Sequence, residues 1–118
     1  MLARFAFALT IVWALWPWAA LAVDAGGLVD GNKLMKWCED RPDDSFLRGL
    51  CLGYVEAIAD TLMAERPGRQ CISRDVTFGQ LEEVVRKYLR EHPENRHYGA
   101  NVLVASALTE AFPCMGKQ

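Results

Sequence analysis

The sequence lacks most of the patterns that mark chemistry in small proteins. It has no C-x-x-C pair, so neither a zinc knuckle nor a thioredoxin-like redox site is indicated, and no C-x-x-C-H motif marks haem attachment. None of Ser45, Ser73 and Ser106 lies in a G-x-S-x-G nucleophile elbow. Basic runs are also absent, and a net charge of −2 makes the chain a poor nucleic-acid binder.

Histidine is scarce, since His92 and His97 are the only two. They are separated by Pro93, which interrupts a helix, whereas helical metal pairs lie three or four residues apart. We therefore expect no metal and no cofactor. The carboxylates of the helix predicted over 77–92 fit a solvent-exposed helix face better than a catalytic acid/base pair. The sequence thus indicates a binding protein and not an enzyme.

The N-terminus shows the three-part pattern of a secretory signal peptide. A short basic region ends at Arg4, an apolar stretch follows, and a small-residue A-x-A exit ends at Ala22, with a second candidate exit at Ala25. We expect residues 1–22 to be removed and the mature protein to lie in the periplasm, away from the membrane. An uncleaved anchor is the alternative, because residues 5–22 are almost wholly apolar and a span takes about 20 residues.

Four cysteines follow this leader: Cys38, Cys51, Cys71 and Cys114. Export places them in an oxidising compartment, so two disulfides are expected. A chain of this size makes one domain with a modest core, which two disulfides would help to stabilise.

Apolar periodicity and capping residues predict an all-α fold, a small disulfide-linked bundle of about four helices. The helical domain is expected over 32–118, after a flexible lead-in over 23–31, with helices over 32–40, 46–66, 77–92 and 96–112. Thr77 and Gln80 fit a capping box at the third helix. In the second helix, the stripe of Gly49, Gly53 and Ala57 predicts close packing of another backbone.

Short connections favour antiparallel neighbours, and this topology constrains the disulfides. If the first two helices run antiparallel, Cys38 meets Cys51. The fourth helix then returns to the end of the bundle where Cys71 lies and brings Cys114 there. The expected pairs are therefore Cys38–Cys51 and Cys71–Cys114, among three possible connectivities.

Four motifs together resemble the Rap/Tai immunity proteins of type VI secretion systems: CLGYV at 51–55, CISRDVTFGQL at 71–81, YLREHPENRH at 88–97 and ALTEAFPC at 107–114. The resemblance implies a periplasmic, all-helical homodimer that binds a cognate peptidoglycan amidase effector and occludes its active-site cleft. Leu52 and Met63 add apolar surface that supports a dimer. Because the motifs are caps, core residues, cysteines and turns, a protein of this fold with another cell-envelope partner and no toxin would also carry them.

For an inhibitor of this kind, we predict a binding surface made of the charged face of helix 77–92 and the turn after it. Pro93 stiffens this turn, which reduces the ordering entropy lost on binding. The expected partner-binding residues are Glu83, Lys87, Arg90, His92, Glu94, Asn95, Arg96, His97 and Tyr98. A turn that only joins two helices is the alternative interpretation.

Overall fold

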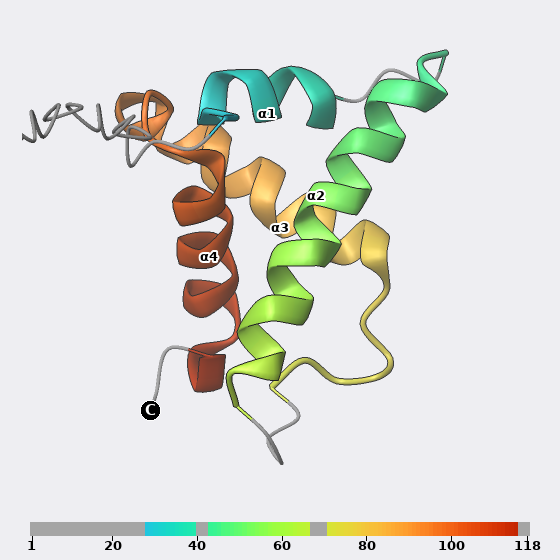
Figure 1. The fold of residues 1–118 in the computed structure, drawn as a ribbon, viewed down its shortest axis with the longest axis vertical. Coiled ribbons are helices and arrows are strands. Elements are labelled where there is room, and N and C mark those ends of the chain that lie inside the picture. The colour runs from blue at the N-terminus through green and yellow to red at the C-terminus, as the bar shows by residue number, and fades with distance from the viewer. Residues whose placement is uncertain (1–27, 40–42, 67–70, 116–118) are drawn as a thin grey trace, which may run out of the picture.

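The computed structural model describes residues 28–39, 43–66 and 71–115, and these contain no β-strand. Figure 1 shows α1 across one end of the bundle, α2 and α4 descending from that end, and α3 passing behind them. The helices are α1 (Gly31–Cys38), α2 (Ser45–Ala64), α3 (Phe78–Glu91) and α4 (Ala100–Ala111), with 3-10 turns η1 (Pro93–Asn95) and η2 (Pro113–Met115). The predicted fold class is confirmed. The expected signal peptide and both cleavage positions lie outside the described residues.

Side-chain caps fix where the first three α-helices begin. Asp30 and Asp44 each accept a hydrogen bond from the backbone N–H three residues further along, which satisfies a donor that the helix leaves free. At α3, the Thr77 hydroxyl accepts the Gln80 N–H at 3.2 Å, and the Gln80 side-chain oxygen accepts the Thr77 N–H at 2.7 Å. The predicted capping box is therefore present.

The predicted start of the fourth helix at residue 96 is wrong, because α4 begins at Ala100. The backbone of the preceding residues is paired elsewhere: the Tyr98 carbonyl accepts the Gly31 N–H, and Ala100 donates to the Val29 carbonyl. Asp30 and Gly99 form an isolated β-bridge between these segments. The last residues of the expected lead-in are thus hydrogen-bonded into the fold, and this pairing replaces the first turn of the expected helix.

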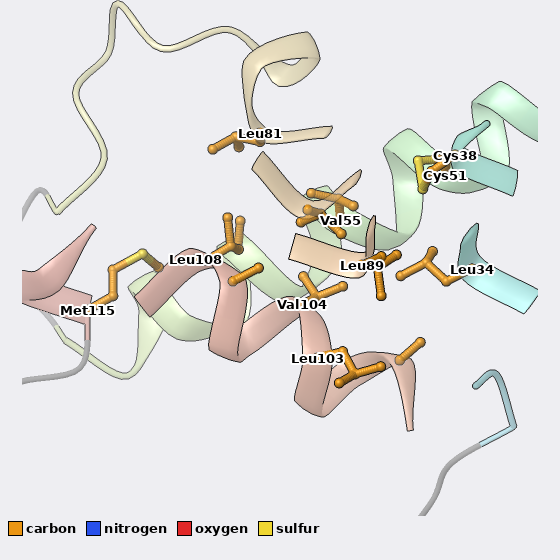
Figure 2. Close-up of a cluster of buried hydrophobic side chains, with 14 of the residues drawn as sticks. Leu34, Cys38, Cys51, Val55, Leu81, Leu89, Leu103, Val104, Leu108 and Met115 are labelled. Carbon is orange, nitrogen blue, oxygen red and sulfur yellow. A yellow bond between two sulfur atoms is a disulfide. The ribbon is translucent and has the colours of Figure 1, made fainter. Parts of the chain in front are cut away.

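The core lies where the four α-helices meet, and every one of them contributes to it (Figure 2). The largest fully buried apolar side chains are Leu34, Val55, Val85, Leu89, Val104, Leu108 and Met115. Burial of each such side chain contributes roughly 1.5–3 kcal/mol. Since η2 places Met115 in the same cluster, the end of the described chain closes the core.

Two disulfides hold opposite ends of the bundle. Cys38 and Cys51 are joined with a Cα–Cα distance of 5.1 Å, and Cys71 and Cys114 with one of 5.5 Å. These are the pairs that the expected topology favoured, although α1 lies across the start of α2 and not alongside it (Figure 1). The first bond therefore joins α1 to α2, and the second joins the segment after α2 to η2.

Among the described residues, no other backbone packs against the glycine stripe of α2, so the predicted close packing is wrong for this part of the chain. Gly49, Gly53 and Ala57 are all exposed. A Cβ atom added at either glycine would meet nothing within 4 Å. The other helices instead cover the side of α2 that carries Cys51 and Val55, which are buried.

Candidate partner-binding surface

A chain of local hydrogen bonds builds the turn between α3 and α4. His92 closes the last turn of α3, donating its N–H to the Tyr88 carbonyl at 3.0 Å. Pro93 then begins η1, because proline has no N–H with which to continue the helix. The Asn95 N–H donates to the His92 carbonyl at 3.1 Å, and the Tyr98 N–H donates to the Asn95 carbonyl at 3.0 Å. The turn is therefore ordered by its own backbone.

Contacts on two sides fasten this turn to the bundle. The Arg96 Nε donates to the Leu89 carbonyl at 2.6 Å, satisfying a carbonyl near the end of α3. The Arg96 carbonyl accepts the Asn32 N–H at 3.1 Å, and the Tyr98 carbonyl accepts the Gly31 N–H at 3.1 Å. The turn is therefore a braced projection, with one contact to α3 and two to the start of α1.

Sequence reasoning missed the two residues of α1 that take part in this bracing, Gly31 and Asn32. Asn32 also approaches the Arg96 carbonyl with its side-chain Nδ2, at 3.4 Å, across 64 residues of sequence. No local pattern signals such a contact. The one available hint was the glycine, which permits close approach: a Cβ on Gly31 would lie 2.9 Å from the Cα of Arg96.

The turn displays aromatic and acidic side chains on its outer side. Tyr98 is 53 % exposed, and its ring centroid lies 4.0 Å from that of His97. His92 is 4.4 Å from the Tyr88 ring, and its Nδ1 is 3.3 Å from the exposed Glu94 carboxylate. The turn can thus offer an aromatic anchor and a carboxylate on a fixed backbone.

The electrostatics of the turn keep Glu94 charged. A hydrogen bond from its own backbone N–H lowers the pKa of the Glu94 carboxyl, desolvation acts in the opposite direction, and His92 and Arg96 lower the pKa further. At neutral pH the turn therefore presents a carboxylate. The two histidines contact different tyrosines, and the described ranges hold no group of three His, Cys, Asp or Glu residues arranged for a metal ion.

The outer stripe of α3 leads into this turn. Glu83, Lys87 and Arg90 are exposed, and their spacing of four and three residues aligns them on one side of the helix. Lys87 pairs with Glu91, with an Nζ–Oε1 distance of 3.9 Å, and not with Glu83 as its helical spacing suggested. The stripe carries charges of both signs.

The charged face of α3 is narrower than the sequence suggested. By their position in the helical pattern, Glu82 and Arg86 fall on the charged side, but Glu82 is buried and the Arg86 side chain is only 19 % exposed. Their charged groups lie 3.8 Å apart, and Arg86 also donates to the Cys38 carbonyl at 3.4 Å. Because α1 packs on this side of α3, the pair connects two helices and is not free for a partner.

The structure therefore divides the nine expected partner-binding residues into two groups. Arg96, His92 and Asn95 are partly buried, and Arg96 uses its side chain to brace the turn. The others are exposed along the outer stripe of α3 and the turn: Glu83, Lys87, Arg90, Glu94, His97 and Tyr98. These exposed residues and the braced turn form one continuous surface, which we call the turn surface.

A family model described as Rap1a immunity proteins matches residues 30–114. The chain belongs to the Rap1a immunity protein family. The match begins at the capping residue of α1 and ends at the last cysteine, so it includes all four α-helices and both disulfides. A comparison with curated proteins and one with solved structures found no match.

Membership of the Rap1a family supports two general conclusions about this chain. An immunity protein acts by binding an effector, so a protein partner is implied. The two disulfides, together with the family, indicate an exported protein, since such bonds persist in oxidising compartments. Within the described ranges, none of the helices is both long and apolar enough to cross a bilayer.

Proposed function

We propose that this Rap1a family member is a periplasmic immunity protein that binds a peptidoglycan amidase effector of type VI secretion and occludes its cleft. In this proposal, residues 1–22 direct export and are removed after Ala22 or Ala25. The observation that carries it is the braced turn, a projection whose backbone is hydrogen-bonded to both α1 and α3. Family membership supplies the immunity role.

A steric inhibitor needs shape and rigidity, and it needs no catalytic group of its own. The turn loses little conformational entropy on binding, because its hydrogen bonds already order it. Tyr98 supplies the kind of half-exposed aromatic side chain that is enriched at binding hot spots. The mixed charges of Glu83, Lys87 and Arg90 would then set orientation and rate of association more than affinity.

Truncation of Tyr98 tests the proposal directly. We expect Tyr98→Ala to weaken binding to the amidase by about 30-fold, roughly 2 kcal/mol, because it removes the central aromatic contact. Titration calorimetry with a purified peptidoglycan amidase that the parent protein binds measures the loss, and peptidoglycan hydrolysis should be restored in parallel. Arg96 is a poorer choice, since its replacement would also release the turn.

The matched control for this experiment is Phe78→Ala. Phe78 is also an exposed aromatic residue, 61 % accessible, but it lies at the opposite end of α3. We expect this variant to bind the amidase as the parent does, and both variants to keep their helical content. Equal losses for the two variants, or full affinity in Tyr98→Ala, would place the binding site elsewhere.

We also propose that the protein is a homodimer in which the outer face of α2 packs against its counterpart. This face carries Phe46, Gly49, Gly53 and Ala57, all exposed and uncharged. The glycines would let a second helix approach closely, which accounts for a spacing that one copy of the chain leaves unused. Met63 packs against the core, so it contributes less to a dimer than the sequence suggested.

Light scattering at micromolar concentration should give the mass of a dimer for the parent and of a monomer for Gly53→Leu. The space around Gly53 is open, and leucine has a higher helix propensity than glycine. The substitution should therefore not unfold the individual subunit. Gly79→Leu, at an exposed glycine of α3, is the control and should remain dimeric. A parent that scatters as a monomer contradicts the proposal.

A further inference from the structure

A groove of about 650 Å³ lies at the other end of the molecule from the turn between α3 and α4 (Figure 1). One wall is the C-terminal half of α2, and the other is formed by residues 72–76 and the start of α3. Figure 1 shows this segment running beside the lower half of α2, whereas the turn between α3 and α4 lies near α1. A ligand in the groove would therefore leave the turn between α3 and α4 free.

The floor of the groove is apolar and its rim carries an exposed aromatic ring. Ala59, Ile72 and Leu81 are buried at the floor, and Val76 is partly buried. Phe78, at the first position of α3, is 61 % exposed. The capping box needs the side chains of Thr77 and Gln80 but puts no demand on that of Phe78, one of the two residues between them. A large apolar side chain exposed beside an apolar floor is typical of an interaction site.

The α2 wall carries two carboxylates that are not neutralised by the fold. Glu56 and Asp60 both line the groove and lie four residues apart, a spacing at which like charges repel on a helix. Neither forms a salt bridge with another described residue, and Arg74 on the opposite wall is likewise unpaired. The α2 side of the groove is therefore complementary to a cation, and the Arg74 side to a carbonyl or carboxylate.

The walls are fixed before any ligand arrives. The Cys71–Cys114 disulfide ties the 72–76 segment to η2. Within that segment, the Val76 N–H donates to the Ser73 carbonyl at 3.0 Å, which closes a turn. A preformed site of this kind loses little entropy when it is filled.

We propose that this groove is a second protein-binding site, which accepts a partner segment carrying a lysine or arginine beside an apolar side chain. The cation lies between Glu56 and Asp60, the apolar side chain contacts the floor and Phe78, and a backbone carbonyl of the segment faces Arg74. The groove lies apart from the turn that carries Tyr98, so this site and the proposed amidase contact can be tested independently.

The test uses the disulfide-bonded protein and two synthetic peptides, acetylated and amidated, of sequence LKLKL and LELEL. Nitrogen-15 NMR titration with LKLKL should shift the amides of residues 56–63 and 72–78 and leave those of 92–99 unchanged. LELEL should produce no such shifts. The variant Glu56→Gln/Asp60→Asn, which keeps shape and removes charge, should weaken LKLKL binding at least five-fold.

The matched control is Glu83→Gln/Glu110→Gln, which removes the same charge from exposed positions outside the groove. It should bind LKLKL as the parent does. If this control loses as much LKLKL affinity as Glu56→Gln/Asp60→Asn, the binding reflects general charge attraction. If the parent binds LELEL as well as LKLKL, the groove does not select charge. Either result overturns the proposal. Shifts of residues 72–78, on the wall away from α2, that depend on protein concentration without peptide would show a second copy as the occupant, which also overturns it.

Discussion

Replacing Cys71 and Cys114 together by alanine is expected to lower the free energy of unfolding by about 4 kcal/mol. The bond spans a sequence separation of 43 residues, and the entropy of closing a loop of that length in the unfolded chain accounts for a loss of this size. Small domains are stable by only about 5–15 kcal/mol in total. The variant should therefore be marginally folded, with the 71–76 segment and η2 loosened first.

Urea unfolding followed by circular dichroism measures this loss, and reducing agent provides the control. With reductant, the parent also loses both disulfides, so the parent and the double variant should unfold at the same urea concentration. A difference that persists in reductant would mean that packing of the sulfur atoms, and not the covalent link, supplies the stability. A loss below about 1 kcal/mol under oxidising conditions would contradict the loop-closure argument.

Replacing Gly31 by valine should cost about 3 kcal/mol of stability, at the upper end for overpacked sites. An added Cβ would lie 2.9 Å from both the Cα and the carbonyl oxygen of Arg96, and it would overlap the side chain of Leu103. The Arg96 backbone cannot retreat easily, because its side chain holds the Leu89 carbonyl. The start of α1 must instead move away and release its hydrogen bonds to the turn.

The same urea experiment checks this prediction, with Gly79→Val as the matched control. Gly79 also lies in a helix, and its added Cβ would meet only the Thr77 hydroxyl oxygen, at an ordinary contact distance of 3.8 Å, so valine should leave the protein as stable as the parent or slightly more stable. Hydrogen exchange adds a local readout: the Gly31 and Asn32 amides should lose protection in Gly31→Val. A variant as stable as the parent would show that the turn is not held by this contact.

The sequence by itself determined the features that depend on local interactions. Helix periodicity, the Thr77–Gln80 capping box and the proline and glycine stops placed α1, α2 and α3 to within a few residues, because each signal acts within one or two turns. The disulfide pairs followed from helix order, because that order brings Cys38 to Cys51 at one end of the bundle and Cys71 to Cys114 at the other. The motifs likewise resembled the family whose model matches the chain.

Only the tertiary structure decided which sides of the helices are covered. The helical pattern places Glu82 and Glu83 on the same charged side, but in the folded chain Glu82 is buried beside Arg86 and Glu83 lies in solvent. The start of α4 depended on hydrogen bonds between the Gly31 region and residues 96–100, which are distant in sequence and carry no local signal. The turn surface and the groove both form where such distant segments meet. Side chains and peptide groups that look equivalent in a local sequence pattern become different when a distant segment packs against one of them, because the covered group must then find its partners inside the fold.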